Sequence, residues 1–394
     1  MKIVGCVVLK KDREGPVRGG NPWIFSQAIV RTEPANLAAG DGVTVFDIAG
    51  NRLGFGYFNP STTIAVRMLA FGERLEPEQI ERYRIRRALE LRHKIISRDT
   101  DCYRLLNGDG DGLSGVVIDR YEDVVVVQLM TAGADRMRGE VVATLQELLS
   151  PRAMVERSSG AVRRQEGLAD RAGLLAGESV SALTVKENGI ELLVDVENGQ
   201  KTGCFLDQRE NRARLSEMAG GARVFDGYCY SAGFSLAALR GGAKQVVAVD
   251  TSGPALEWAG RNFELNRWPP QCYELVRHEA SQYLSQSHEQ FDIVVFDPPP
   301  LARSLKDVPR AAQLYTELNC TAMRAVANGG FLMTFSCSAH FRGEDFLRAV
   351  RIAAVRAGRN FRLVQRLGPG QDHPSMLGHS EGEYLTGFLL AEMS

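Results

Sequence analysis

The sequence of 394 residues has no long apolar run and few cysteines for its length. Its longest apolar stretches, such as residues 124–127, are far shorter than the ~20 residues that span a bilayer. The N-terminus has no apolar run or cleavage site typical of a signal peptide. The seven cysteines are scattered and never paired as Cys-x-x-Cys, which argues against a disulfide framework or a structural zinc site. We therefore expect a cytoplasmic protein with no membrane association and no metal.

An excess of charge of either sign is also absent. The chain has 47 Lys and Arg against 48 Asp and Glu, so its formal net charge is −1. Any binding of nucleic acid must therefore come from local basic regions. One such region is a helix predicted over residues 77–94, with the basic residues Arg82, Arg84, Arg86, Arg87, Arg92 and Lys94. They would either contact RNA phosphates or cover a solvated helix face, and the second interpretation is slightly favoured.

The residue patterns divide the chain into three regions, as its length suggests. Residues 1–75 contain short strand-like runs between turn signals, which indicates a small β-barrel. Residues 76–198 mix strands and helices in an α+β module. Residues 199–394 alternate apolar strands with helices, which is typical of a doubly wound α/β sheet. The strands expected in the first two regions lie at 3–9, 42–48, 53–57, 62–68, 115–118, 124–129 and 154–156, with a second helix near 134–149.

Ligands of a doubly wound sheet bind at the carboxyl ends of its strands. The expected strand 222–225 runs into a loop that contains Asp226, Gly227, Tyr228 and Gly233. The expected strand 245–249 ends at Asp250, which can accept hydrogen bonds from both hydroxyls of a ribose. An acidic residue about 20 positions after a glycine loop is the usual spacing.

That loop lacks the Gly-x-Gly-x-x-Gly spacing that holds a pyrophosphate. An acidic and aromatic loop instead suits S-adenosylmethionine, which carries a cationic sulfonium and no phosphate. An ordinary strand-to-helix turn would look the same. Glu279, after an expected strand at 273–276, can accept from the adenine amino group or lie in an exposed turn.

Two motifs indicate the chemistry. Asp297-Pro298-Pro299 follows the expected strand 291–296. Proline fixes the backbone and has no N–H, so Asp297 and the nearby carbonyls can accept hydrogen bonds from the edge of a nucleobase. This favours a base methyltransferase. Ser336-Cys337-Ser338 follows the expected strand 331–335 and makes Cys337 a candidate nucleophile, although a lone cysteine is more often a small core residue.

A thiol is useful because carbon 5 of cytosine is a poor nucleophile. Addition of a thiolate to carbon 6 makes the ring an enamine whose carbon 5 can attack a sulfonium methyl, and loss of the carbon-5 proton then expels the thiolate. An ordinary thiol is only slightly ionised at neutral pH, so the site should lower the pKa of Cys337. Asp297 can stabilise the charge that builds up on the ring.

Together these residues resemble the RlmI-type family of bacterial 23S ribosomal RNA cytosine-C5 methyltransferases, over nearly the whole chain. The motifs that carry the resemblance lie at residues 21–25, 109–115, 199–209, 297–299 and 336–338. The resemblance implies a PUA domain, a central α+β domain and a class I methyltransferase domain with a Rossmann-like fold. It also implies 23S ribosomal RNA as partner and Cys337 as nucleophile. By the same resemblance, Lys201, Thr202, Phe205, Asp207 and Gln208 lie against the methionine end of S-adenosylmethionine.

One departure concerns release of the product. Many RNA cytosine-C5 methyltransferases have a second cysteine beside the aspartate–proline motif, where this chain has Pro300 and Leu301. Two other functions therefore stay open: methylation of a purine nitrogen, with Cys337 idle, and a non-catalytic RNA-binding factor in ribosome assembly. The sequence also leaves a homodimer open.

Overall fold

The computed structural model describes residues 1–72, 76–302, 304–338 and 340–393. Its contacts divide the chain into two compact units. The first comprises Met1–Val185, Val194–Leu206 and Gln371–Gly382, and the second Lys186–Leu193, Asp207–Gly370 and Glu383–Ser394. Along the described part of the chain, every helix is too short or too polar to cross a bilayer.

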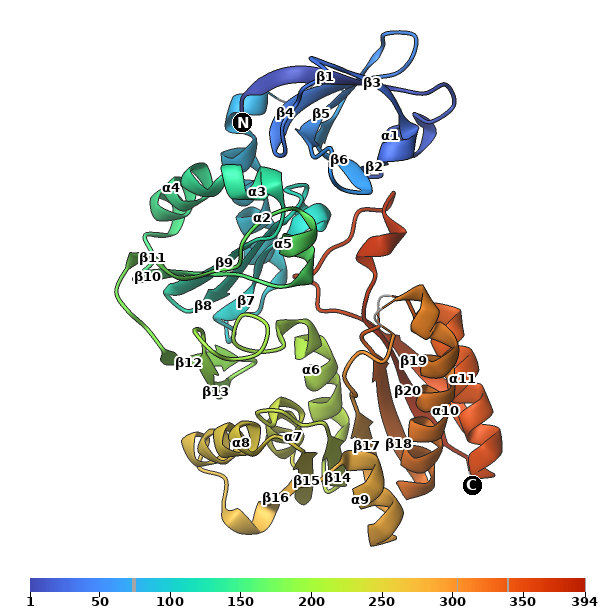
Figure 1. Ribbon diagram of the computed structural model, residues 1–394. Coiled ribbons are helices and arrows are strands. Elements are labelled where there is room, and N and C mark those ends of the chain that lie inside the picture. Colours follow the sequence, from blue (N-terminus) through green and yellow to red (C-terminus); the bar gives the residue numbers. More distant parts are fainter. Residues whose placement is uncertain (73–75, 303, 339, 394) are drawn as a thin grey trace. The chain divides into compact units, whose positions relative to one another are not determined.

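The first unit begins with a six-stranded sheet in the order β2-β6-β5-β4-β1-β3 (Figure 1). Its strands are β1 (Ile3–Leu9), β2 (Trp23–Phe25), β3 (Ile29–Glu33), β4 (Asp41–Phe46), β5 (Arg52–Phe58) and β6 (Ile64–Phe71), with the short helix α1 (Gly15–Arg18). Val7, Val43, Val45 and Met68 lie in a separate apolar core. The four predicted strands are confirmed; β2 and β3 were not predicted.

A second sheet in the first unit has the order β11-β10-β9-β8-β7. Its strands are β7 (Cys102–Asn107), β8 (Val116–Tyr121), β9 (Val124–Leu129), β10 (Ala153–Ser158) and β11 (Arg171–Gly177). The helices of this region are α2 (Ile80–Ile95), α3 (Ala132–Arg136), α4 (Arg138–Leu149) and α5 (Ala161–Gln165). Tyr57 of β5, Ile85 of α2 and Val127 of β9 belong to one buried cluster. The two sheets and α2 therefore share a hydrophobic core.

The basic residues of α2 do not form one uniform face. Arg92 is fully buried, donates to both carboxylate oxygens of Asp111 at 2.6 and 2.7 Å, and donates to the carbonyl of Asp372 at 2.6 Å. Arg84 donates to the carbonyl of Leu69 at 2.7 Å. The solvated-face interpretation was therefore wrong for Arg84 and Arg92, which hold the first unit together. The other members are exposed: Arg82 and Arg87, which pair with Glu147 and Glu90, and Arg86 and Lys94.

A β-hairpin was missed by the sequence analysis. Strands β12 (Ala182–Glu187) and β13 (Ile190–Asp195) pair through the turn Asn188-Gly189. Both turn residues have positive φ, 50° and 76°, which is the requirement of the two-residue turn that an Asn-Gly pair favours.

The second unit is built on a seven-stranded sheet in the order β16-β15-β14-β17-β18-β20-β19. Its strands are β14 (Arg223–Gly227), β15 (Gln245–Asp250), β16 (Tyr273–Arg277), β17 (Phe291–Phe296), β18 (Val326–Ser336), β19 (Phe361–Leu367) and β20 (Thr386–Glu392). All pairs from β16 to β18 are parallel, and β20 is antiparallel to its neighbours.

Helices cover both faces of this sheet (Figure 1). One layer contains α6 (Arg209–Met218), α7 (Gly233–Arg240) and α8 (Gly253–Leu265), and the other α9 (Ala280–Ser287), α10 (Val308–Ala325) and α11 (Gly343–Ala357). From β14 the chain moves outward to β15 and β16, and then returns to the other side of β14 as β17. The order of strands therefore reverses between β14 and β17, where doubly wound sheets bind ligands. The predicted fold of this region is confirmed.

Removal of the Arg92 guanidinium should destabilise the first unit, because it leaves the buried carboxylate of Asp111 without its cation. We expect Arg92→Met to lower the free energy of unfolding by about 3–5 kcal/mol, measured by urea denaturation followed by circular dichroism. Arg86→Met, on the exposed side of the same helix, is the control and should change it by less than about 0.5 kcal/mol. Equal effects of the two substitutions would contradict this account of Arg92.

Candidate active site

Several predicted site residues lie at the ends of neighbouring strands in the second unit. Asp226 is the penultimate residue of β14, and Asp250 is the last residue of β15. Asp297 directly follows β17, and Cys337 directly follows β18. Because these strands are parallel neighbours, their carboxyl ends lie along one edge of the sheet. We call this edge the carboxyl rim.

The loop after β14 has a strained backbone. Tyr228, Tyr230 and Ala232 have φ of 63°, 50° and 66°, a conformation that costs a non-glycine residue ~1–2 kcal/mol. The N–H of Tyr230 donates to Asp250 at 3.0 Å, which ties the loop to the end of β15. A Cβ at Gly227 would lie 2.8 Å from the ring of Phe225, so only glycine fits there. Strain of this kind is often held at ligand sites.

Asp226 is buried beneath this loop, with 1% of its surface exposed. One oxygen accepts from both the N–H and the hydroxyl of Ser235, at 3.0 and 2.7 Å. Burial raises the pKa of Asp226 to about 7; the Ser235 hydrogen bonds oppose the rise, and the charges of Asp297 and Asp250 add to it. The carboxyl rim therefore concentrates negative charge.

Glu279 is half-buried and has three donors within the second unit. It accepts from Tyr228 Oη at 2.8 Å, from Ser281 Oγ at 2.6 Å and from the N–H of Gln282 at 2.7 Å, which caps α9. Burial alone would raise the pKa of Glu279, but these hydrogen bonds outweigh it and lower that pKa. Glu279 is therefore a fixed carboxylate that stands beside the Tyr228 side chain.

Gln208 and Asn211 form a short relay to Asp297. The amide N–H of Gln208 donates to Asp297 Oδ2 at 2.8 Å, and the amide oxygen of Gln208 accepts from Asn211 at 2.6 Å. Gln208 and Asn211 are both 3% exposed. Asn211 thus fixes which end of the Gln208 amide faces the carboxylate. Sequence reasoning missed Asn211 because nothing in its local pattern distinguishes it from any polar helix residue.

Asp207, another residue predicted to contact the cofactor, accepts from Tyr384 Oη at 2.7 Å, and its carbonyl accepts from the N–H of Gly370 at 2.9 Å. These hydrogen bonds join the segment before α6 to the ends of β19 and β20. Tyr384 was not identified from the sequence.

Cys337 is half-buried, and its Sγ lies 3.6 Å from the carbonyl oxygen of Pro298. The nucleophile candidate and the Asp-Pro-Pro turn are therefore adjacent. The flanking serines brace this arrangement: Ser338 Oγ accepts from the N–H groups of Leu301 and Ala302 at 3.0 and 3.1 Å. Pro298 is buried, and Pro299 is exposed.

Three further predicted residues belong to the first unit. Thr202 is buried, donates to Asp119 at 2.5 Å and lies 2.9 Å from Tyr121 Oη. The ammonium of Lys201 lies 4.5 Å from the ring centre of Phe205, a cation–π contact. In this unit these residues fix the segment at 201–205, while the other predicted residues gather in the second unit.

The raised pKa of Asp226 should make stability depend on pH. The folded protein keeps a proton here that the unfolded chain loses near pH 4, so this contribution to stability is present below about pH 4 and is lost as pH rises through about 7. Asp226→Asn cannot ionise and keeps an acceptor for Ser235. We expect its free energy of unfolding, relative to wild type, to increase from about pH 5 to about pH 8 in urea denaturation. Asp345→Asn, at an exposed position of α11, is the control. If the difference in free energy of unfolding from wild type does not change with pH for either variant, Asp226 ionises normally.

Two family models match the chain: a PUA-like domain over residues 7–71 and an S-adenosylmethionine-dependent methyltransferase over residues 106–377. The chain is 38% identical to "Ribosomal RNA large subunit methyltransferase I" of Photobacterium profundum, over 97% of this chain and 98% of the relative. The Escherichia coli O157:H7 protein of the same name is 36% identical over the same shares.

Solved structures share the fold. A methyltransferase from Streptococcus mutans superposes with a TM-score of 0.82 at 22% identity, over 99% of this chain and 100% of that one. The structure of the methyltransferase SMU.776 complexed with SAH gives a TM-score of 0.84 with the same identity and coverage. At this identity the likeness concerns the fold alone.

Proposed function

The chain belongs to the family of ribosomal RNA large subunit methyltransferase I and is an S-adenosylmethionine-dependent methyltransferase, and on this basis we propose that it methylates carbon 5 of a cytosine in 23S ribosomal RNA. The family, fold class and cofactor expected from the sequence are thereby confirmed. The base, the covalent route and the site residues remain proposals, argued below from the carboxyl rim.

The carboxyl rim suits a cationic cofactor. The charges of Asp250 and Asp297 both raise the pKa of Asp226, so these three carboxylates repel one another. A cation placed among them relieves that repulsion. When bound, S-adenosylmethionine supplies an electrophilic methyl group on a positively charged sulfur.

We assign the ribose hydroxyls to Asp250 and the adenine amino group to Glu279, with Tyr228 beside it. Asp226 and Gly233 support the loop that would enclose the cofactor. The residues retained as further cofactor contacts are Lys201, Thr202, Phe205, Asp207 and Gln208.

One observation carries the proposed cytosine chemistry: the sulfur of Cys337 lies 3.6 Å from the carbonyl of Pro298, in the turn that begins with Asp297. A pyrimidine held by Asp297 and by the carbonyls of Pro298 and Pro299 would thus have a thiol beside it. Methylation of a purine nitrogen needs no such thiol. The adjacency therefore favours cytosine over the purine alternative.

In the proposed reaction, each bond that forms is matched by a bond that breaks. The Cys337 thiolate adds to carbon 6, and the electron pair of the 5,6 double bond moves toward the ring edge that faces Asp297. Carbon 5 would then accept the methyl group that bound S-adenosylmethionine supplies, and the electron pair of the broken methyl–sulfur bond would stay on the sulfur. Loss of the carbon-5 proton to a solvent water restores the double bond and expels the thiolate. Asp297 contributes by holding the ring and by stabilising its added charge.

Substitution of Cys337 tests the covalent route. We expect Cys337→Ala to lower kcat for methylation of 23S ribosomal RNA by at least about a thousandfold, because the ring loses its nucleophile. Affinity for S-adenosylmethionine in calorimetry should change less than about twofold. Cys272→Ser, a half-buried thiol of the same unit, is the matched control and should keep wild-type turnover.

RNA that contains 5-fluorocytosine adds a direct readout. Carbon 5 then has no proton to lose, so the thioether should persist and appear as a protein–RNA band on a denaturing gel with wild type but not with Cys337→Ala. Retained turnover by Cys337→Ala would eliminate the covalent route and favour a purine nitrogen. Failure of the wild-type protein to bind S-adenosylmethionine would instead favour the non-catalytic assembly factor.

Asn211 should act as a positioning residue for Asp297. In Asn211→Asp the new carboxylate would attract the amide N–H of Gln208 and turn its oxygen toward Asp297. We expect kcat to fall about ten- to a hundredfold and the limb of the pH–rate profile governed by Asp297 to move to higher pH. Asn211→Ala, which leaves Gln208 able to rotate, should have the smaller effect. Equal kcat and pH profiles in all three proteins would remove Asn211 from this role.

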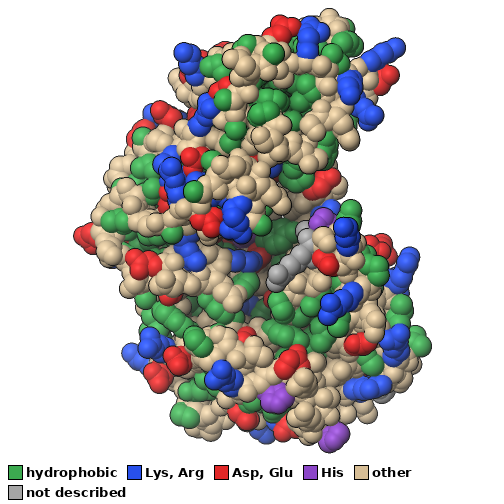
Figure 2. All heavy atoms as spheres, viewed as in Figure 1, with side chains coloured by type: hydrophobic (Ala, Val, Ile, Leu, Met, Phe, Trp, Pro, Cys, Tyr) green, Lys and Arg blue, Asp and Glu red, His purple; other side chains and the backbone are tan. Residues whose placement is uncertain are grey.

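The remaining expectations follow from the same proposal. We assign RNA recognition to residues 1–75, a connecting α+β role to residues 76–198 and catalysis to residues 199–394. A 23S ribosomal RNA substrate implies a cytoplasmic location. Over the face in view, basic and acidic side chains are interspersed (Figure 2), so we expect RNA to contact discrete sites and not one broad basic surface.

A further inference from the structure

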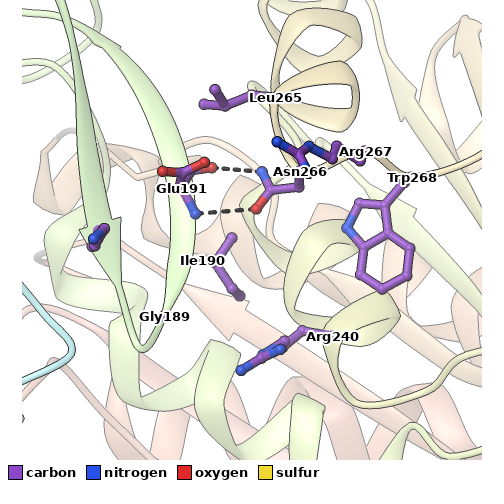
Figure 3. Close-up of a pocket in the computed structure, with 9 residues that line it drawn as sticks. Gly189, Ile190, Glu191, Arg240, Leu265, Asn266, Arg267 and Trp268 are labelled. Carbon is purple, nitrogen blue, oxygen red and sulfur yellow. Dashed lines mark hydrogen bonds between the residues drawn. The ribbon is translucent and has the colours of Figure 1, made fainter.

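A pocket of about 340 Å³ opens in the second unit, away from the residues described above. It is lined by Lys186, residues 189–191, Arg240 and residues 265–268, and we call it the hairpin pocket. Figure 3 shows the turn of the β12–β13 hairpin on one side and the ends of α7 and α8 on the other. Its volume lies within the range of pockets that bind small molecules or single groups of a larger ligand.

The pocket has rigid walls. Asn266 donates to the carbonyl of Glu191 at 2.7 Å and accepts from the N–H of Glu191 at 3.1 Å (Figure 3). Asn262 accepts from the N–H of Leu193 at 2.7 Å. Asn262 is fully buried. The end of α8 thus continues the hydrogen bonding of β13 and holds the hairpin in place.

The charge of the pocket is predominantly positive. Lys186, Arg240 and Arg267 come from three separate elements and are all exposed, and Glu191 is the single acidic residue of the lining. An Nη atom of Arg240 lies 3.6 Å from the point where a side chain at Gly189 would place its Cβ. The guanidinium of Arg240 therefore lies against the hairpin turn. A basic residue at the end of a helix stabilises the helix dipole. That effect applies to Arg240 and to Arg267, which both lie at helix ends, but it does not explain Lys186 or why three cations surround one cavity beside Trp268.

Arg267 stands where glycine would be less strained. Its φ is 57°, directly after the end of α8, and this left-handed position after a helix is usually glycine. A side chain here costs ~1 kcal/mol or more relative to glycine. Arg267 therefore gives up backbone stability while it places a guanidinium at the pocket.

We propose that the hairpin pocket binds one nucleotide of the ribosomal RNA substrate, separate from the nucleotide that is methylated. Arg240, Arg267 and Lys186 take the phosphate, and the indole of Trp268 stacks on the base. Glu191 can accept a hydrogen bond from a base amino group. This inference rests on the proposed function, since it identifies a second contact with the same class of substrate.

The position of the pocket defines its use. Helices α7 and α8 begin at the carboxyl rim and run back along the strands, so their ends lie at the opposite edge of the sheet. The 13 residues of α8 span ~20 Å. An RNA held at the carboxyl rim and at the hairpin pocket is thus fixed at two points of the second unit. The contact at the pocket orients the target base without touching that base.

The test measures binding of an in vitro transcript of 23S ribosomal RNA to the full-length protein by filter binding, over a series of salt concentrations. For the double substitution Arg240→Gln with Arg267→Gly, we expect Kd to rise about 10- to 100-fold near 0.1 M salt. The slope of log affinity against log salt should decrease by about 0.7–0.9, the value for one phosphate that is no longer neutralised. The matched control is Arg348→Gln with Arg356→Gln, two exposed arginines of α11, which should stay within about threefold of wild type.

Two further variants separate binding from folding. Arg267→Gly alone should keep or raise Tm, because it relieves backbone strain. The same substitution should weaken RNA binding, because it removes the guanidinium. Trp268→Ala should raise Kd about tenfold, and Trp268→Phe, which can still stack, should recover most of the affinity.

Unchanged Kd and salt slope in the double variant, with Trp268→Ala equal to wild type, would overturn the proposal. Methylation of cytosine by wild type is measured in parallel. If the wild type does not methylate cytosine, the proposed function is refuted, and the binding comparison still decides whether the pocket binds RNA. If the wild type methylates cytosine and all variants bind RNA equally, only the proposed role of the pocket is refuted.

Discussion

Three carboxyl groups are held close together at one edge of the sheet in the second unit, where burial first and their mutual repulsion second raise the pKa of Asp226. Asp226, Asp250 and Asp297 end or follow three adjacent parallel strands, so backbone pairing forces them together. Each receives hydrogen bonds from its own unit: Ser235 donates to Asp226, the N–H of Tyr230 to Asp250 and Gln208 to Asp297. These donors hold the three carboxyl groups in fixed positions. The geometry of the rim is thus fixed by hydrogen bonds within the second unit.

In the first unit, by contrast, arginines with little or no exposed surface are paired with carboxylates. Arg92 pairs with Asp111, and Arg104 pairs with Asp119, which is itself fully buried. Asp119 also accepts from Thr202, so the segment at 194–206 is tied to β8. Such pairs add little net stability but are costly to break, and they therefore specify which distant segments meet. The second unit also contains a buried pair of this kind, between Arg212 and Glu187.

Elements with a strong local signal could be predicted, and those defined by partners could not. β9 and β17 are nearly continuous apolar runs, interrupted by one polar residue each, and the sequence located both. β19 was missed because it is an edge strand with mostly exposed residues, so its pattern does not differ from that of a loop. The hairpin of β12 and β13 was also missed, although its Asn-Gly turn is a recognisable signal. For the arginines of α2, the sequence shows the charge but not whether a carboxylate from elsewhere lies beside it.

By itself the sequence determined the chemical groups and their order: Asp226, Asp250, Asp297 and Cys337 each stand at or just after the end of an expected strand. Parallel strands end at one edge, so this order already brought Asp250, Asp297 and Cys337 into one neighbourhood. Only the tertiary structure decided the contacts within it. The relay from Asn211 through Gln208 to Asp297 and the seat of Cys337 against Pro298 depend on side-chain directions, which no local pattern records. The hairpin pocket likewise exists only because the ends of two helices and one turn converge, at positions far apart in the chain.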